Sequence, residues 1–247
     1  MKLLFVNNFR GRGGGEEFLR DLLPGLVEKG AEVGIICRPG TPLAGMFSAG
    51  EIKVFLIPRS GLQGLTSVFK TAQVIRDGAY SLVAIQRGHD IIQSWIGAVL
   101  SRKRPALMYI AQVPEFVRSR FLLSRMDKVV TISRYIRDRI VSFYAAAASK
   151  TSIIYYGIDS RQFRASQEAG ARFRKRVGLQ QSDQVIGTVG DLWKNQIEFL
   201  NALVLIKKVI PHVRFVLAGS GADTTFVRDF RNRAGALGLS DALVWPG

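Results

Sequence analysis

Short apolar runs alternate with segments of helical periodicity along the whole chain, and this alternation is the strongest constraint on its fold. Strands that alternate with helices of about ten to fifteen residues predict βαβ units. Strands that are apolar throughout are typical of parallel sheets covered on both faces. The strands predicted on this basis are Lys2–Asn7, Glu32–Cys37, Ile52–Ile57, Leu82–Gln86, Leu107–Ala111, Lys128–Ile132 and Ser152–Tyr156, followed by Val185–Val189, Val213–Ala218 and Ala242–Trp245. Two of the helices predicted between these strands are a short one near Phe116–Ser124 and one that Ser133 caps and that runs to about Ala146. The predicted class is α/β.

The chain divides into two series of such units. Residues 157–184 are polar and basic with little strand signal, apart from a helical stretch at Glu168–Val177. We therefore predict two Rossmann-like domains, at residues 1–157 and 158–247. The second series has three predicted strands, and Pro246-Gly247 follows the last of them without a helix. We expect this second domain to be incomplete.

Composition excludes several classes of protein. Of the 247 residues, 47% are hydrophobic and 22% are charged, which predicts a folded chain with a core. No apolar stretch reaches the roughly 18–20 residues that span a bilayer, and the N-terminal apolar run is too short for an export signal. The single cysteine, Cys37, excludes an intramolecular disulfide and makes a cysteine metal site unexpected. We expect a cytoplasmic protein without a bound metal.

Positive charge is concentrated in the middle of the chain. The net charge is +16, and residues 101–176 hold 17 basic and 5 acidic side chains. An anionic partner is therefore plausible, either nucleic acid, an anionic membrane or a phosphorylated small molecule. The alternative is a solvated basic face with no specific partner.

The first predicted strand leads into a glycine-rich turn, Gly13-Gly14-Gly15, followed by Glu16 and a helix. Glycine lets a ligand approach the backbone closely, and the N-terminus of the helix presents unpaired N–H groups with a positive dipole end. This combination suits a phosphate or pyrophosphate. The glycine spacing matches neither the dinucleotide fingerprint nor the P-loop, and a flexible turn is the alternative.

The second series repeats this pattern. The strand Val185–Val189 ends at Gly190, and Lys194 stands just before the next helix. A lysine in this position can neutralise a phosphate. The next strand ends in Gly219-Ser220-Gly221, another tight glycine turn.

His89 and Gln112 are the candidate catalytic residues of the first domain. His89 follows the strand Leu82–Gln86, next to Asp90, and can act as a general base or contact an acceptor. The alternative is a histidine at a helix start with Asp90 as the cap. Gln112 follows the strand Leu107–Ala111 and can form hydrogen bonds, but it cannot carry a proton at neutral pH.

Taken in order, these motifs resemble those of the GT-B glycosyltransferases of family 4, the group 1 glycosyltransferases. The resemblance covers nearly the whole chain. It rests on Gly13–Glu16, Val129–Ser133, Ile153–Asp159 with Phe163, Gly187–Lys194 with Gln196 and Leu200, and Pro211–Gly221.

The resemblance implies a hexosyltransferase that moves a sugar from a nucleotide-sugar donor to a cell-surface glycan or lipid-linked acceptor, with retention and without a metal or other cofactor. The implied pathway is polysaccharide or lipopolysaccharide assembly. N–H hydrogen-bond donors and positively charged groups would stabilise the negative charge of the departing diphosphate. The donor-binding residues carried over are Gly13, Gly14, Gly15, Glu16, Gly190, Lys194, Gly219 and Gly221. Together they predict two glycine-lined strand ends that meet one diphosphate.

The chain departs from the family pattern at three places. Asp191 stands where an arginine is frequent, and its negative charge would repel a diphosphate unless it faces away. Gln112 stands where a histidine near the reacting sugar is frequent, and it can hydrogen-bond a sugar hydroxyl. The glutamate segment that holds the donor sugar in the family has no counterpart before Gly247. This last departure favours an alternative function, a non-catalytic homologue that acts as a binding module.

Two further alternatives are weaker. A nucleic-acid binder is favoured by charge alone, since no recognition motif is present, and we expect no nucleic-acid partner. A NAD-dependent enzyme lacks its glycine fingerprint. Arginines interleaved with Phe and Leu in residues 101–139 instead predict peripheral contact with an anionic membrane surface.

Overall fold

The computed structural model describes residues 1–47, 50–58, 63–113, 119–191, 194, 196–219 and 224–246. The strands in these residues are β1 Lys2–Asn7, β2 Glu32–Cys37, β3 Lys53–Leu56, β4 Leu82–Ile85, β5 Ala106–Ala111, β6 Lys128–Thr131, β7 Thr151–Ile153, β8 Val185–Val189, β9 Arg214–Ala218 and β10 Leu243–Val244. The α-helices are α1 Gly14–Glu28, α2 Pro42–Met46, α3 Gln63–Gly78, α4 Ile91–Ser101, α5 Arg120–Ser124, α6 Arg134–Phe143, α7 Gln167–Arg176, α8 Gln196–Val209 and α9 Thr224–Ala236. Short 3₁₀ helices lie at Gly88–Asp90 and Ala145–Lys150.

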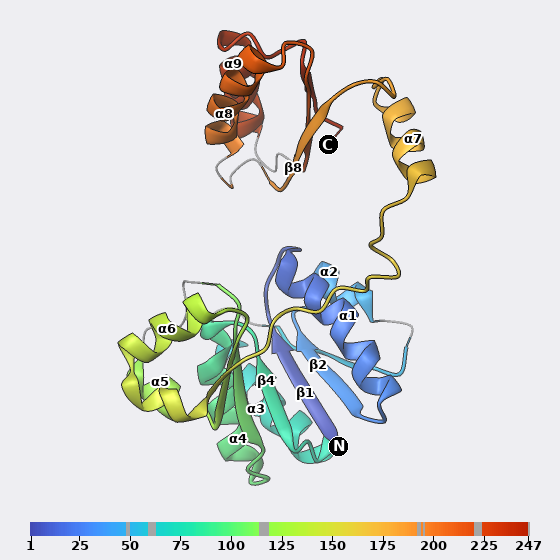
Figure 1. Cartoon of the computed structure of the whole chain (residues 1–247). Helices are drawn as coiled ribbons and strands as arrows, with labels where there is room; N and C mark the ends of the chain where they lie inside the picture. The colour runs from blue at the N-terminus through green and yellow to red at the C-terminus, as the bar shows by residue number, and fades with distance from the viewer. Residues whose placement is uncertain are drawn as a thin grey trace. The chain divides into compact units, whose positions relative to one another are not determined.

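The chain forms two compact units, Met1–Ile158 and Asp159–Gly247, which we call unit 1 and unit 2 (Figure 1). Each has its own parallel sheet and its own core. The α/β class and the Rossmann-like sheets predicted from the sequence are confirmed.

The described part of unit 1 contains a seven-stranded parallel sheet in the order β3-β2-β1-β4-β5-β6-β7. The chain leaves β1 toward β2 and β3, and it leaves β4 in the opposite direction toward β5, β6 and β7. The carboxyl ends of β1 and β4 therefore form a topological switch point, which is where open parallel sheets bind ligands. Val6 pairs with Ile85 in this ladder, so the segments that follow these two strands begin side by side.

Both faces of this sheet are covered because successive side chains of a strand point to opposite sides. Leu3 and Phe5 of β1 belong to the core beneath α1 and α2, whereas Leu4 and Val6 belong to the core beneath α3, α4, α5 and α6. All four side chains are buried, and each contributes about 1.5–3 kcal/mol relative to exposure. Beyond β7 the chain returns across the sheet to α1 (Figure 1), where the ring of Tyr156 stacks on Phe18 at 4.5 Å.

Unit 2 contains a three-stranded parallel sheet, β10-β9-β8, within its described residues. Side chains of α8 and α9 pack on it and enclose Phe215 and Phe230. Gly190 follows β8 and Gly219 follows β9, so the two glycines lie at the same carboxyl edge.

Every predicted strand overlaps an observed one, but two helices differ from prediction. Ser133 caps α6 by accepting a hydrogen bond from the N–H of Ile136, as predicted. That helix was predicted to run to about Ala146, yet α6 ends at Phe143 because Tyr144 adopts an extended backbone (φ −144°, ψ 90°). The helix predicted at Phe116–Ser124 is observed as α5, and residues 114–118 lie outside the described residues.

Cys37 ends β2 and is fully buried, and burial raises the pKa of its thiol to about 11. At pH 8 about one thiol in a thousand would then be ionised, and the thiolate is the reactive form. We expect a disulfide reagent at pH 8 to leave the native chain unlabelled and to label Cys37 fully in guanidinium chloride. Equal labelling rates in the two states would contradict a buried β2.

Candidate functional site

The candidate site of unit 1, which we call the strand-end site, lies where α1 begins, beside the switch point. Gly13 is the N-cap of α1. Because glycine has no side chain, it makes no side-chain capping hydrogen bond to the helix. Its carbonyl accepts hydrogen bonds from the N–H groups of Glu16 and Glu17. The first N–H groups of a helix lack intrahelical acceptors, so Gly14 and Gly15 can present theirs to an anion.

Glu16 was predicted to contact a donor, but its side chain is fully buried. Its Oε1 accepts hydrogen bonds from Nδ2 of Asn7 at 2.8 Å and from a terminal nitrogen of Arg87 at 2.9 Å. Asn7 Nδ2 also donates to Oε1 of Gln86 at 2.7 Å. The carboxylate of Glu16 thus joins β1, α1 and the end of β4 from inside the protein.

Arg87 lies on the exposed side of this network. Its guanidinium is stacked over the ring of Phe9 at 4.1 Å. A terminal nitrogen of Arg87 lies 3.7 Å from the position that a Cβ on Gly15 would occupy. The guanidinium therefore adds positive charge beside the N-terminus of α1.

His89 lies in the 3₁₀ turn between β4 and α4, and its ring is exposed. Its Nε2 is 3.6 Å from Oδ1 of the fully buried Asp90. Asp90 is the N-cap residue of α4, but its side chain makes no capping hydrogen bond to that helix. The carboxylate instead accepts hydrogen bonds from the backbone N–H and Nδ2 of Asn8 at 3.1 and 3.0 Å. His89 is thereby placed beside the end of β1, although it follows β4.

Gln112 reaches the same site from the end of β5. Its Oε1 lies 2.7 Å from the position that a Cβ on Gly15 would occupy, so only glycine fits there without displacing it. Burial raises the pKa of the neighbouring Tyr156 to about 12, while the charge of Arg87 and a hydrogen bond with Gln112 act in the opposite direction. Tyr156 is therefore a neutral phenol at physiological pH.

Unit 2 brings three predicted site residues together at its own sheet edge. The N–H of Gly190 donates to the carbonyl of Ala218 at 2.8 Å, directly before Gly219. Lys194 is exposed, and its Nζ is 3.9 Å from Oδ2 of Asp191. The predicted repulsion between Asp191 and a phosphate is thus offset in part by Lys194. Gly221 lies outside the described residues.

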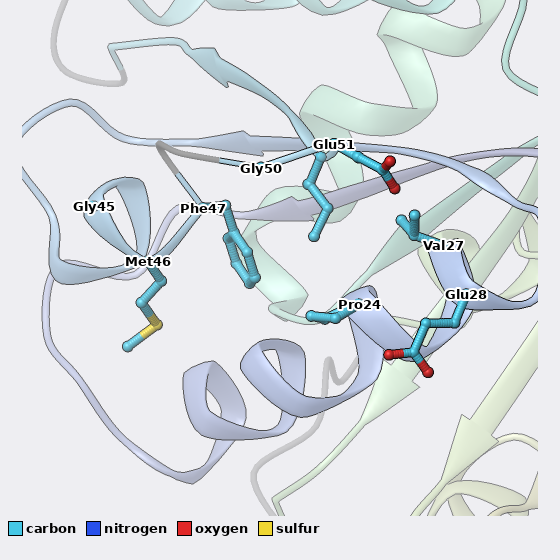
Figure 2. Close-up of a pocket in the computed structure, with 9 residues that line it drawn as sticks. Pro24, Val27, Glu28, Gly45, Met46, Phe47, Gly50 and Glu51 are labelled. Carbon is cyan, nitrogen blue, oxygen red and sulfur yellow. The ribbon is translucent and has the colours of Figure 1, made fainter.

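A cavity of about 390 Å³ lies elsewhere in unit 1, at the opposite end of α1. Figure 2 shows Phe47 and Pro24 facing each other across it, with Glu28 and Glu51 at one side. None of the predicted site residues lines this cavity, so it is separate from the strand-end site.

Within the described residues, no group of three or more His, Cys, Asp or Glu side chains could hold a metal ion. None of the helices in the same part of the chain combines the length and the apolar character needed to cross a membrane.

Sequence reasoning missed Asn7, Arg87 and Tyr156. A basic residue at the end of β4 is a detectable signal, but the sequence alone did not show that β4 lies next to β1. Glu16 and Arg87 are 71 positions apart, and a parallel ladder brings them together.

The sequence pattern of Glycosyltransferase Family 4 matches residues 12–162, which is more than half of the chain. The chain belongs to Glycosyltransferase Family 4. The matched region begins one residue before the glycine turn at Gly13 and covers the ends of β4, β5 and β7, so every candidate residue of unit 1 lies inside it.

Two curated relatives show sequence similarity to this chain. An uncharacterized glycosyltransferase of Methanocaldococcus jannaschii is 27% identical over 125 residues, which are 49% of this chain and 31% of that protein. The GDP-mannose-dependent alpha-(1-6)-phosphatidylinositol monomannoside mannosyltransferase of Mycolicibacterium smegmatis is 26% identical over 172 residues, which are 69% of this chain and 40% of that protein. The matches thus span less than half the length of each relative.

Solved structures show the same fold. The Anabaena protein HepE in complex with UDP superposes with a TM-score of 0.79 at 20% identity, over all of this chain and 69% of that protein. The fold of this Family 4 chain is GT-B, as predicted.

Proposed function

We propose that this Family 4 chain carries the activity of a glycosyltransferase that moves a sugar from a nucleotide-diphosphate sugar to a glycan or lipid-linked acceptor, with retention. The observation that carries the proposal is the glycine-lined start of α1 at the switch point, with Gln112 and Arg87 beside it. HepE has been crystallised with UDP and with UDP-glucose, which supports a nucleotide-sugar donor. The name of the mycobacterial relative supports a lipid-linked acceptor.

In unit 2, Gly190 and Lys194 bind the diphosphate of the donor in this proposal. Negative charge grows on the leaving diphosphate as the glycosidic bond breaks. A fixed ammonium group and backbone N–H donors stabilise that charge more strongly in the transition state than in the ground state, which lowers the barrier. The proposal needs no metal and no other cofactor.

In unit 1, the N–H groups at Gly13–Gly15 bind phosphate oxygens, and two side chains contact the acceptor. His89 acts as the general base or contacts the acceptor, and its Nε2 lies 3.6 Å from Oδ1 of Asp90. Gln112 hydrogen-bonds a sugar hydroxyl. Glu16 has no exposed surface and acts through Asn7 and Arg87.

The function is tested by calorimetric titration of the full chain with UDP, GDP and ADP, followed by transfer assays with the corresponding sugars. Binding of one nucleotide together with sugar transfer is the expected result. Binding without transfer would favour the alternative of a binding module. Failure to bind any of the three nucleotides would remove the donor assignment.

We also propose that unit 1 contacts an anionic membrane surface at the cytoplasmic side. The contact is the α4–α5 face, which we define as Ile92, Trp95, Val99, Phe121 and Arg125. Trp95 and Phe121 meet edge to face at 5.4 Å, and the guanidinium of Arg125 lies 5.2 and 4.7 Å from their ring centres. Ile92, Val99 and Phe121 are exposed.

Charge favours a lipid surface as the partner of this face. Exposed basic residues follow α4 directly at Arg102, Lys103 and Arg104. Each basic side chain near an anionic leaflet contributes about 1 kcal/mol, and exposed aromatic groups add apolar burial. Residues 114–118, part of the predicted basic segment, lie outside the described residues.

Phe121→Ser is expected to weaken sedimentation with anionic vesicles about tenfold or more, because burying a Phe side chain contributes about 1.5–3 kcal/mol. The measurement compares phosphatidylcholine vesicles with vesicles that also contain phosphatidylglycerol. Phe226→Ser in unit 2 is the matched control, since Phe226 is 45% exposed and Phe121 is 51% exposed. Equal partition of the unaltered chain into both vesicle types would refute the proposal.

A further inference from the structure

Arg87 is a charged side chain at the switch point to which neither the sequence motifs nor the comparisons give a role. It follows β4 directly, and its side chain is 24% exposed. Most of the described arginines are exposed, whereas this one is largely enclosed and still reaches solvent. Such a position is unusual for arginine unless it is paired.

Two contacts hold the guanidinium in one orientation. One of its terminal nitrogens donates to Oε1 of the fully buried Glu16 at 2.9 Å. The ring of Phe9 covers one face of the guanidinium at 4.1 Å. Glu16 is itself held by Asn7, so the pair is braced by β1. An arginine fixed in this way loses little side-chain entropy when it binds a ligand.

The guanidinium lies beside the N-terminus of α1, whose first N–H groups lack intrahelical acceptors. Gly15 of that terminus lies beside one terminal nitrogen of Arg87, and Oε1 of Gln112 lies against Gly15. The Nε of Arg87 is buried and meets no acceptor among the described residues. A sugar hydroxyl both donates and accepts, but a phosphate oxygen only accepts, and guanidinium matches it with paired N–H groups. The arrangement therefore favours phosphate.

We propose that Arg87 is the cationic contact through which unit 1 binds a phosphate group, and that Glu16 is its positioning residue. This inference rests on the proposed function, since the phosphate belongs either to the departing nucleoside diphosphate or to a phosphorylated acceptor. The two sources share the same chemistry at Arg87. They differ in which ligand loses affinity when Arg87 is replaced.

The test titrates the full chain with UDP and, separately, with glycerol 3-phosphate as a phosphomonoester probe. Arg87→Gln is expected to weaken one of the two about tenfold or more, and Arg87→Lys to weaken it less, because lysine keeps the charge but loses the paired donors. Arg20→Gln is the matched control on α1, where Arg20 pairs at the surface with Asp21, and it is expected to change neither affinity more than about twofold.

Glu16→Gln tests the positioning role. We expect it to weaken binding of the same ligand, and we expect no further loss when it is combined with Arg87→Gln, because the carboxylate acts only through Arg87. The double variant removes both charges, so it leaves no unpaired ion in the interior if Arg87→Gln alone fails to fold. Additive losses in the double variant would refute the positioning role.

The outcomes separate this inference from the proposed function. Loss of UDP affinity assigns Arg87 to the leaving diphosphate, and loss of glycerol 3-phosphate affinity assigns it to the acceptor. Unchanged affinity for both in folded Arg87→Gln overturns the inference while the proposed function stands. If the unaltered chain binds glycerol 3-phosphate through Arg87 but binds no nucleotide, the donor assignment is wrong and the inference stands. If the unaltered chain binds neither ligand, the donor assignment and the inference are both wrong.

Discussion

Lys194→Ala is expected to slow sugar transfer about 100-fold or more, with a smaller loss of nucleotide affinity. Lys194 stands between β8 and α8 with its ammonium group exposed, and the charge on a leaving diphosphate is greatest in the transition state. Removing one fixed donor from such a site costs about 10²–10³ in rate. The measurement is the initial rate of transfer at saturating donor, together with the Kd for the nucleotide.

Lys208→Ala provides the control for this prediction. Lys208 is an exposed lysine in the last turn of α8, in the same unit, and its replacement removes the same charge. We expect it to change the rate less than twofold. If the two variants slowed transfer equally, the effect of Lys194 would reflect the general field of unit 2 and not contact with the diphosphate.

Gly219→Ala is expected to destabilise unit 2 by about 3 kcal/mol and to abolish nucleotide binding by displacing the Gly190 turn. A Cβ on Gly219 would lie 2.0 Å from the carbonyl oxygen of Gly190 and 2.6 Å from its carbonyl carbon. These are backbone atoms, which cannot rotate away as a side chain can, and overpacking of this kind costs about 1–3 kcal/mol or more. Urea unfolding followed by circular dichroism and by Trp fluorescence measures the loss. Trp245 reports locally, because its Nε1 donates to the carbonyl of Gly219 at 2.8 Å.

Gly170→Ala is the matched control in the same unit. Gly170 lies within α7, and a Cβ there would meet nothing within 4 Å. Alanine is favoured over glycine inside a helix by about 0.5–1 kcal/mol, so this variant is expected to be slightly more stable. If Gly219→Ala were as stable as Gly170→Ala, the close packing of the two strand ends would be wrong.

Most of the secondary structure could be predicted because its signal is local. The apolar run Lys2–Asn7 is β1 to the residue, and Val185–Val189 is β8 to the residue. The end of α6 was missed because Tyr144 leaves the helix by a backbone conformation that residue type does not specify.

The candidate site could be predicted only in part. The glycines at Gly13–Gly15 were found because a glycine-rich turn between a strand and a helix is itself a sequence pattern. Glu16 was predicted to face a ligand, and burial against Asn7 and Arg87 gives it an internal position instead. A carboxylate just after such a turn looks the same in sequence whether it faces the ligand or the core.

The amino-acid sequence by itself determined the alternation of strands and helices, the parallel sheets and the glycine turns at strand ends, because each depends on residues that are near neighbours in the chain. Only the tertiary structure decided that β1 pairs with β4, since strand order depends on packing between distant segments. That pairing places Arg87 beside Glu16 and Gly15, and Asp90 beside Asn8. The positions of these charged groups follow from the ladder between two strands and not from any spacing along the chain.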